Sequence, residues 1–251
     1  MEQQPLVSVI MPCYNMERFI TDTIHSVVNQ TFVNWELLVV DDASTDGTVE
    51  LVKALCEKDD RIHLSVNSEH SGIAKTRNRC IKQAKGRFFA FLDADDLWHP
   101  DKLQRQISFM QERQMGFSYT AYDLIDEEGK PLGKTIKTAG DLDYEAYLRN
   151  TIIGCSTVMV DTHKVCRVVV PDFRTSEDAA TWLDILKHGF VAYAFEQPLT
   201  SYKIRRKSAS SNKFKASADL WSVYRQNEKL PFLKAACCFL CYVFNAIKKR
   251  L

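Results

Sequence analysis

The stretch FFAFLDADD, residues 88–96, sets five apolar residues directly before three carboxylates. A short apolar run bounded by polar residues is typical of a buried β-strand. The side chains of Asp93, Asp95 and Asp96 then fall at the carboxyl end of that strand, where open α/β sheets bind their ligands. The stretch therefore predicts both an α/β fold and the place of a binding site.

Upstream of this stretch, strand-like and helix-like patterns alternate. Short apolar runs rich in β-branched residues predict strands, and apolar residues that recur every three or four positions predict helices. The expected strands cover 6–11, 35–40 and 62–66, and the expected helices cover 20–28, 49–55 and 73–84. This rhythm predicts a Rossmann-like, mostly parallel sheet with helices on both faces.

Each of the four predicted strands ends in a polar stretch. These are PCYN (12–15), DDAST (41–45), SEHSG (68–72) and DADD (93–96). Because the carboxyl ends of parallel strands meet at one edge of a sheet, we expect the four stretches to line a shared crevice.

The second half of the chain is less regular. It predicts a strand over 116–126 with a hairpin turn over 127–134, a strand over 156–161, and a helix over 176–189 that Gly189 ends. Short strands are expected at 191–195 and 199–204, and a basic, Ser-rich loop at 205–215.

Composition narrows the class of protein. The chain has 251 residues, 45% of them hydrophobic and 26% charged, which fits one large globular α/β domain or two small ones. A formal net charge of +1 provides no general attraction to nucleic acid, so no nucleic-acid partner is expected. The N-terminus lacks a basic stretch before a long apolar one, which predicts no signal peptide and a cytoplasmic protein.

The eight cysteines are scattered, and in a reducing compartment they are expected to be small core residues. Cys237, Cys238 and Cys241 resemble a metal-ligand spacing, but no second Cys/His pair follows them. Burial on a helix is the favoured interpretation of this cluster.

The acidic turn allows two interpretations. Three carboxylates in four residues repel one another unless a cation lies between them, and carboxylate oxygens select hard divalent ions such as Mg²⁺ or Mn²⁺. Such an ion keeps open positions for phosphate oxygens. Alternatively, Asp95 or Asp96 caps the helix that follows Pro100, a role that needs one carboxylate only.

The C-terminal segment is almost continuously apolar. From Phe232 to Ile247 only Lys234 and Asn245 interrupt the apolar residues, and KKR follows at 248–250. The segment is short for a membrane span, which needs about 20 apolar residues. It predicts a helix that lies in the membrane interface with its basic end on anionic lipid, or one that packs against a partner. Packing on the protein's own core is the other interpretation.

Six motifs, in order and approximate spacing, resemble those of the inverting family-two glycosyltransferases with the GT-A fold. They are VSVIMPCYN, IHSVVNQTF, WELLVVDDASTDGT, SGIAKTRNRCIKQAKG, FFAFLDADDLWHPDKL and EDAATWL. The second half most resembles small bacterial members that build lipopolysaccharide, capsule or teichuronic acid chains. The resemblance implies a GT-A domain over 1–210, with a nucleotide-binding half over about 1–100 and an acceptor-binding half over about 101–210, and it leaves 211–251 as a helical membrane-association segment.

The resemblance also implies roles for residues at matching positions. Asp42 would accept a hydrogen bond from the nucleotide base. Asp93 and Asp95 would form the metal-binding DXD pair, with Asp95 as the direct ligand and Asp93 facing the nucleotide or ribose. The implied nucleotide-sugar contacts are Pro12, Tyr14, Asn15, Asp42, Gly72, Arg77, Asp93, Ala94, Arg205 and Arg206. Arg205 and Arg206 would close over the diphosphate, or else contact lipid head groups.

By the same resemblance, Asp178 of the "ED" pair is the catalytic base, and Asp96 and Glu177 lie at the sugar and acceptor site. Trp182 lies one helical turn after Asp178, so we expect it to form part of the acceptor wall. Without the family, acidic residues at 177 and 178 are also explained by the positive end of the helix they open. A lone tryptophan such as Trp182 is also common in a core.

The resemblance implies an inverting sugar transfer from a nucleotide sugar, with Mn²⁺ or Mg²⁺ as cofactor. A UDP-sugar is the expected donor, on the basis of the family alone. The acceptor would be a lipid-linked glycan of the polyprenyl diphosphate type, at the inner face of the cytoplasmic membrane. Two alternatives stay open: a sugar-nucleotide nucleotidyltransferase, for which PCYNMERF lacks a phosphate-binding glycine, and a non-catalytic, membrane-associated protein that binds nucleotide sugars.

Overall fold

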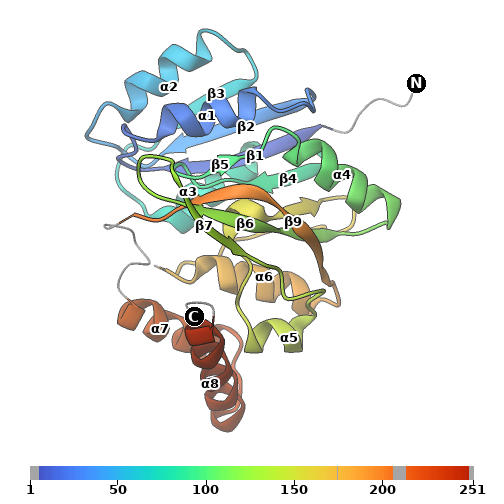
Figure 1. Ribbon diagram of the computed structural model, residues 1–251. Coiled ribbons are helices and arrows are strands. Elements are labelled where there is room, and N and C mark those ends of the chain that lie inside the picture. The colour runs from blue at the N-terminus through green and yellow to red at the C-terminus, as the bar shows by residue number, and fades with distance from the viewer. Residues whose placement is uncertain (1–5, 174, 206–212, 249–251) are drawn as a thin grey trace.

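The first half of the chain alternates strands and helices, as its sequence predicts (Figure 1). The computed structural model describes residues 6–173, 175–205 and 213–248. The first elements are β1 (Val7–Cys13), α1 (Ile20–Val28), β2 (Trp35–Asp41), α2 (Thr48–Cys56), β3 (Ile62–Val66), α3 (Ile73–Gln83) and β4 (Phe88–Phe91). β1 lies between β2 and β4, β3 pairs with β2, and all three pairings are parallel. The carboxyl ends of the four strands therefore share one edge of the sheet.

The second half extends the same sheet with strands of both directions. Its elements are β5 (Leu97–Trp98), α4 (Lys102–Glu112), β6 (Phe117–Ile125), β7 (Pro131–Ile136), α5 (Tyr144–Arg149), the 3₁₀ turn η1 (Cys155–Thr157), β8 (Met159–Asp161), α6 (Glu177–Lys187), β9 (Ala192–Lys203), α7 (Lys213–Ser222), the π-helical turn η3 (Val223–Asn227) and α8 (Phe232–Lys248). Within the described residues the strand order is β3-β2-β1-β4-β8-β6-β9-β5, and β7 pairs with β6. β8 is antiparallel to both β4 and β6, whereas β6 and β9 are parallel.

In the described sheet, one continuous strand replaces two short strands that the sequence predicts. The short strands predicted at 191–195 and 199–204 form a single strand, β9. Its pairing with β6 shifts register on both sides of the Ala121–Pro198 pair. Pro198 has no backbone N–H to donate, so the strand bends through an irregularity there and then continues.

The sheet is buried on both faces, because successive residues of its central strands point to opposite sides. On β1, Val9 and Met11 pack with α1, α2 and α4, whereas Ile10 packs on the other side, with residues of α6 and α8. That second core also contains Leu220, Tyr224, Ala235 and Cys238 of the C-terminal helices. One face of α8 is therefore docked on the rest of the protein, as one of the two sequence interpretations predicts.

Figure 1 shows α7 and α8 at the end of the molecule opposite α1 and α2. α8 has 17 residues. Across residues 6–173, 175–205 and 213–248, we find no helix with both the length and the apolar character of a membrane span.

Lys102, at the start of α4, is the residue for which we expect a stabilising substitution. Its side chain is fully buried, its Nζ lies 4.0 Å from the centre of the Trp98 ring, and the described residues offer that Nζ no hydrogen-bond partner. Burial lowers the pKa of Lys102 to about 7. We expect Lys102→Met to raise the free energy of unfolding at pH 7 by about 2 kcal/mol, because it removes a charge that folding must desolvate.

The effect has a defined pH dependence. Because the pKa of Lys102 is lower in the folded state than in the unfolded state, its protonation opposes folding. The resulting loss of folding free energy grows as pH falls from 10.5 toward 7. The gain from Lys102→Met, measured by urea denaturation, should vanish above pH 10.5. Lys134→Met, at an exposed position of β7, is the control and should change little. Equal stability of Lys102→Met and the parent at pH 7 would contradict the expectation.

Candidate active site

A cavity of about 1250 Å³ opens at the carboxyl ends of β1 to β4. All four polar strand ends contribute to its wall, as the sequence predicts. From these ends and from α3 come Pro12, Tyr14, Asn15, Asp42, His70, Gly72, Arg77, Asp93, Ala94 and Asp95; the second half of the chain adds Tyr122, Ile152, Cys155, Phe173, Glu177, Asp178, Tyr202, Lys203 and Arg205.

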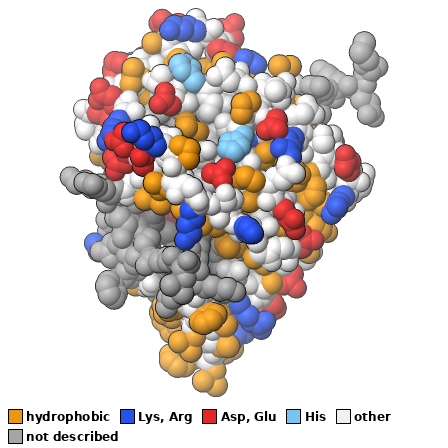
Figure 2. Space-filling model, in the orientation of Figure 1, with side chains coloured by type: hydrophobic (Ala, Val, Ile, Leu, Met, Phe, Trp, Pro, Cys, Tyr) orange, Lys and Arg blue, Asp and Glu red, His pale blue; other side chains and the backbone are white. Residues whose placement is uncertain are grey.

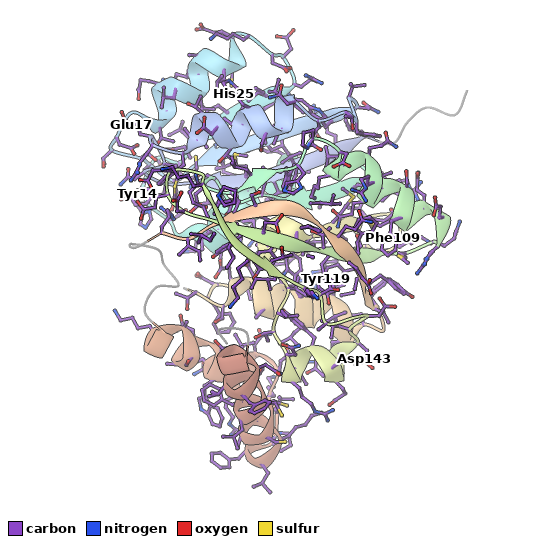
Figure 3. All side chains as sticks on the ribbon, viewed as in Figure 1. Tyr14, Glu17, His25, Phe109, Tyr119 and Asp143 are labelled. Atoms are coloured by element: carbon purple, nitrogen blue, oxygen red, sulfur yellow. The ribbon has the colours of Figure 1, made fainter. Side chains whose placement is uncertain are left out.

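The loop after β1 is tied to the loop after β2. Tyr14 and Glu17 lie on this first loop and are labelled in Figure 3. Asn15 has a positive φ of 52°, and its Oδ1 accepts a hydrogen bond from the backbone N–H of Thr45 at 2.8 Å. The ring of Tyr14 lies 4.3 Å from that of His70, centre to centre, so two strand ends form one aromatic wall.

Asp42 is a strongly held carboxylate in the cavity wall. It accepts hydrogen bonds from the Asn67 side chain at 2.6 Å, from the Ser71 backbone at 2.9 Å and from the Gly72 backbone at 2.8 Å. Burial raises its pKa, but these hydrogen bonds outweigh it and bring the pKa down to about 2. Gly72 has φ +90°, a region that favours glycine, which lets its N–H turn toward Asp42. Asp42 therefore orders the loop of residues 67–72 as well as facing the cavity.

Arg77 joins the two groups of acidic residues that the sequence predicts separately. Its guanidinium is buried and lies 2.7 Å from Asp93, 2.7 Å from Asp178 and 3.3 Å from Glu177. One cation therefore holds the acidic turn after β4 against the start of α6. Glu177 and Asp178 do lie in the first turn of α6, as the helix-dipole interpretation requires, but they also pair with this arginine.

The pKa values of Glu177 and Asp178, in the first turn of α6, are raised. Burial, together with the nearby charge of Asp178, raises the pKa of Glu177 to about 8 despite the opposing charge of Arg77. Burial also raises the pKa of Asp178. A carboxylate with a raised pKa is a stronger proton acceptor, provided that it is ionised when it reacts. Asp178 is the more exposed of the two toward the cavity, with 31% of its side chain accessible against 8% for Glu177.

The three aspartates of the turn have different surroundings. Asp95 pairs with Arg205, whose Nε lies 2.5 Å from its Oδ2, and burial raises the pKa of Asp95 to about 6 against that opposing charge. Asp96 is fully buried, outside the cavity wall, and accepts hydrogen bonds from Ser156 Oγ at 2.6 Å and the Lys203 backbone at 2.9 Å. The prediction of Asp96 at the sugar site is therefore corrected to a structural role.

The helix-capping interpretation of these aspartates is wrong. α4 begins at Lys102, and Asp101 is its N-cap residue, but its side chain accepts no capping hydrogen bond from the backbone of the helix. Asp95 and Asp96 are engaged elsewhere, with Arg205, Ser156 and the Lys203 backbone.

The acidic turn fits a divalent ion that a substrate helps to hold. The Arg205 guanidinium lies beside Asp95, so the negative charge of the Asp95 carboxylate is already paired with a cation at this position. No group of three or more His, Cys, Asp and Glu side chains able to hold a metal occurs in the part of the chain that the structure describes. Mg²⁺ commonly uses one or two carboxylates and completes its shell with substrate phosphates and water. Asp95, with Asp93 beside it, matches that donor set.

One other predicted residue, Trp182, does not reach the cavity wall. Trp182 is buried in the core, where its ring lies 5.1 Å from Phe91 and 5.4 Å from Phe117. It is therefore a core residue and does not form the acceptor wall. Arg206 lies outside the described residues.

Several residues of the cavity wall are not among the predicted site residues. His70 lies in the quoted stretch SEHSG, so the strand-end rule that led to Asp42 includes it too. Tyr202 and Lys203 end β9, and the same rule applied to this strand points to them. Ile152 and Phe173 lie in irregular segments and have no such signal.

The sequence model described as Glycosyl transferase family 2 matches residues 8–173. The chain belongs to glycosyl transferase family 2. Among curated relatives, this family-2 enzyme is 48% identical to TuaG of Bacillus subtilis, named for teichuronic acid biosynthesis, over 99% of this chain and 98% of TuaG. It is 39% identical to WfgD of Escherichia coli, named as a UDP-Glc:α-D-GlcNAc-diphosphoundecaprenol β-1,3-glucosyltransferase, over 97% of this chain and 94% of WfgD.

Solved structures confirm the GT-A fold of this family-2 enzyme. The TarS 1-349 fragment of S. aureus in complex with UDP-GlcNAc superposes with a TM-score of 0.73 at 22% identity, over 87% of this chain. The present chain spans 64% of that crystallised chain, less than two thirds of it. The mannosyltransferase PcManGT of Pyrobaculum calidifontis, in complex with GDP-Man and Mn²⁺, has a TM-score of 0.70 at 19% identity, over 95% of this chain and 70% of its own.

Proposed function

We propose that this enzyme moves a sugar from a nucleoside diphosphate sugar, a UDP-sugar, to a hydroxyl of a lipid-linked glycan, with inversion at the anomeric carbon. The observation that carries the proposal is the Arg77 cluster. It places Asp178 and the acidic turn after β4 in the wall of one cavity. A base and a phosphate-binding turn that share a cavity are what a single displacement on a nucleotide sugar requires.

Asp178 is the catalytic base in this proposal. It takes the proton of the acceptor hydroxyl while that oxygen attacks the anomeric carbon from the face opposite the diphosphate, and a single attack from that face inverts the centre. Glycosidases need a second carboxyl group to protonate a departing alkoxide. A nucleoside diphosphate leaves as a stable anion, so one carboxylate suffices.

The diphosphate lies against the acidic turn. Asp95 and Asp93 would hold Mn²⁺ or Mg²⁺, and such an ion would supply positive charge to balance the negative charge of the leaving group. Arg205 lies beside Asp95 in the cavity wall. Its guanidinium is suited to bind phosphate oxygens, so Arg205 would contact the diphosphate.

The nucleotide lies between the strand ends of β1 to β3. Tyr14 and His70 offer aromatic faces there, and Asp42 faces the same part of the cavity. The acceptor enters from the side of Ile152 and Phe173. WfgD and WfaP of Escherichia coli are named for transfer to a GlcNAc-diphosphoundecaprenol. These names support a polyprenyl diphosphate acceptor, and with it a position at the inner face of the cytoplasmic membrane.

The test is release of nucleoside diphosphate from a panel of sugar nucleotides, with and without a short-chain polyprenyl diphosphate GlcNAc acceptor. We expect release only with one donor class and the acceptor together, loss of release in EDTA, and an inverted anomer in the product. Pyrophosphate production from a nucleoside triphosphate would instead indicate a nucleotidyltransferase, and binding of the donor without release would indicate a non-catalytic protein.

Replacing Asp95 by Asn should weaken metal and donor binding together. The substitution removes the charge that would hold the ion but keeps the size of the side chain, so we expect a loss on the order of tenfold to a hundredfold in Mn²⁺-dependent UDP affinity. Titration calorimetry with UDP, with and without Mn²⁺, measures the loss. Asp101→Asn, a carboxylate outside the cavity, is the control. Unchanged Mn²⁺-dependent affinity in Asp95→Asn would remove Asp95 from the metal site.

A further inference from the structure

α8 has one face on the protein and one face without a described partner. Ala235 and Cys238 are buried in the core, and the Asn245 side chain donates a hydrogen bond to the Arg149 carbonyl oxygen at 3.0 Å. At the start of the helix, Phe232 packs edge-on against Trp221, with ring centres 5.8 Å apart. These contacts fix the rotation of the helix about its own axis.

The opposite face is apolar and exposed. Leu233, Cys237, Leu240 and Phe244 follow the spacing of one helical stripe, and the three large side chains among them are 82%, 69% and 68% exposed. Lys234 lies beside the stripe and pairs with Glu145 of α5 at 2.5 Å. Figure 2 shows hydrophobic side chains gathered at the end of the molecule where α8 lies. We call the stripe of Leu233, Cys237, Leu240 and Phe244 the apolar face of α8.

Charge is distributed very unevenly along the chain. Residues 213–251 contain eight lysines and arginines and two acidic residues, a net charge of +6. Residues 1–212 contain twenty-five basic and thirty acidic residues, a net charge of −5. The overall charge of +1 therefore hides a strongly basic C-terminal region that includes α8.

We propose that the apolar face of α8 inserts into the interface of an anionic lipid bilayer and that the basic side chains of Arg225, Lys229 and Lys234 bind its head groups. A helix with an apolar stripe and a basic surrounding lies in the plane of the interface, with its stripe buried by roughly 5–10 Å. Lys and Arg near an anionic surface add electrostatic attraction that salt screens.

The charge favours a bilayer over a second copy of this chain. Two copies that met through the apolar face of α8 would bring together two regions of net charge +6, which repel each other. An anionic bilayer presents apolar chains beneath negative head groups, so it matches both the stripe and the charge.

This docking also orients the cavity, an argument that rests on the proposed function. α8 packs on α5, and Asp143, which caps α5, is labelled in Figure 3. Directly after α5, the chain enters the cavity wall at residues 151–155. A bilayer bound at α8 therefore lies on the side of the cavity where these residues form the wall, and a lipid-linked acceptor would reach Asp178 past them.

Flotation of the full chain with vesicles tests the surface. We expect binding to vesicles of phosphatidylcholine and phosphatidylglycerol, weaker binding to phosphatidylcholine alone, and loss of binding at high salt. The double variant Leu240→Glu/Phe244→Glu should bind the anionic vesicles more weakly by on the order of tenfold or more, because it removes two large apolar side chains from the interface. Both positions are exposed, so the fold should be retained.

The matched control is Val33→Glu/Leu132→Glu, which adds the same charge at two exposed apolar positions outside α8. It should bind vesicles as the parent does. Equal binding of the α8 variant and this control would overturn the proposal, and so would a parent protein that ignores anionic vesicles. A dimer in light scattering that only the α8 variant abolishes would overturn it in favour of a second copy.

The experiment separates this proposal from the proposed function, since flotation needs neither donor nor acceptor. When sugar transfer is measured, we expect the α8 variant to lose transfer to a polyprenyl acceptor held in vesicles but to keep transfer to a short-chain, water-soluble acceptor. An equal loss with both acceptors would contradict membrane docking. Normal flotation without any transfer would contradict the proposed function alone.

Discussion

Asp178→Asn should lower the rate of sugar transfer by about a thousandfold while donor affinity stays nearly unchanged. The amide keeps the size of the side chain and can still meet Arg77, which lies 2.7 Å away, but it cannot accept a proton from the acceptor hydroxyl. General-base catalysis typically contributes a factor of about 10² to 10⁴, so the loss belongs in kcat. Steady-state rates with the lipid-linked acceptor, and UDP titration of the same preparation, check both parts.

Asp184→Asn is the matched control for this substitution. Asp184 lies on the same helix, α6, six residues further along and outside the cavity wall. Its substitution should leave both rate and affinity as in the parent. If Asp178→Asn transferred sugar at the same rate as the parent, Asp178 would not be the catalytic base. A loss of UDP binding equal to the loss of rate would show that Asp178 acts on the donor instead.

Arg77→Met should lower the free energy of unfolding by about 3–5 kcal/mol. The guanidinium is buried and pairs with Asp93, Asp178 and Glu177, so its removal leaves acidic groups close together without a cation. Breaking a buried pair by removing one partner usually costs this much, because the remaining charge stays desolvated. Urea denaturation followed by circular dichroism measures the change.

Arg105→Met is the comparison, because Arg105 pairs with Asp101 on the surface of α4 at 3.1 Å. An exposed pair one helical turn apart contributes at most about 1 kcal/mol. If Arg77→Met does not fold, Arg77→Lys is the second variant to measure. It keeps the positive charge but lacks the planar guanidinium that bridges three carboxylates, so its free energy of unfolding should lie between those of the parent and Arg77→Met. Equal stability of Arg77→Lys and the parent would mean that the bridging geometry adds nothing.

The parts of this protein that sequence predicts well are those with a local cause. Strands such as β1 and β4 are continuous apolar runs because both sides of each are buried. The strand-end rule then follows from topology alone, since parallel strands bring their carboxyl ends to one edge. For that reason Asp42, Gly72 and Asp93 are found in the cavity wall as expected.

The incorrect predictions for Trp182 and Asp96 have a common cause. The spacing of residues along the chain does not specify how their side chains pack in the folded protein. Trp182 lies one helical turn after Asp178, which predicts a shared position in the acceptor wall. α6 begins at the cavity, but its next turn already packs against Phe91 and Phe117 in the core. Asp96 follows Asp95 directly, yet its side chain turns inward to Ser156 and to the Lys203 backbone. A small change in direction separates a cavity residue from a buried one.

By itself the sequence determined the α/β fold, the strand ends that carry the site and the strongly basic, apolar character of the C-terminal region, because periodicity and composition are local properties of the chain. Only the tertiary structure decided that Arg77 joins Asp93 to Asp178, residues 85 positions apart, and which face of α8 remains exposed. Contacts between distant segments depend on how whole elements pack, and no short stretch of sequence contains that information.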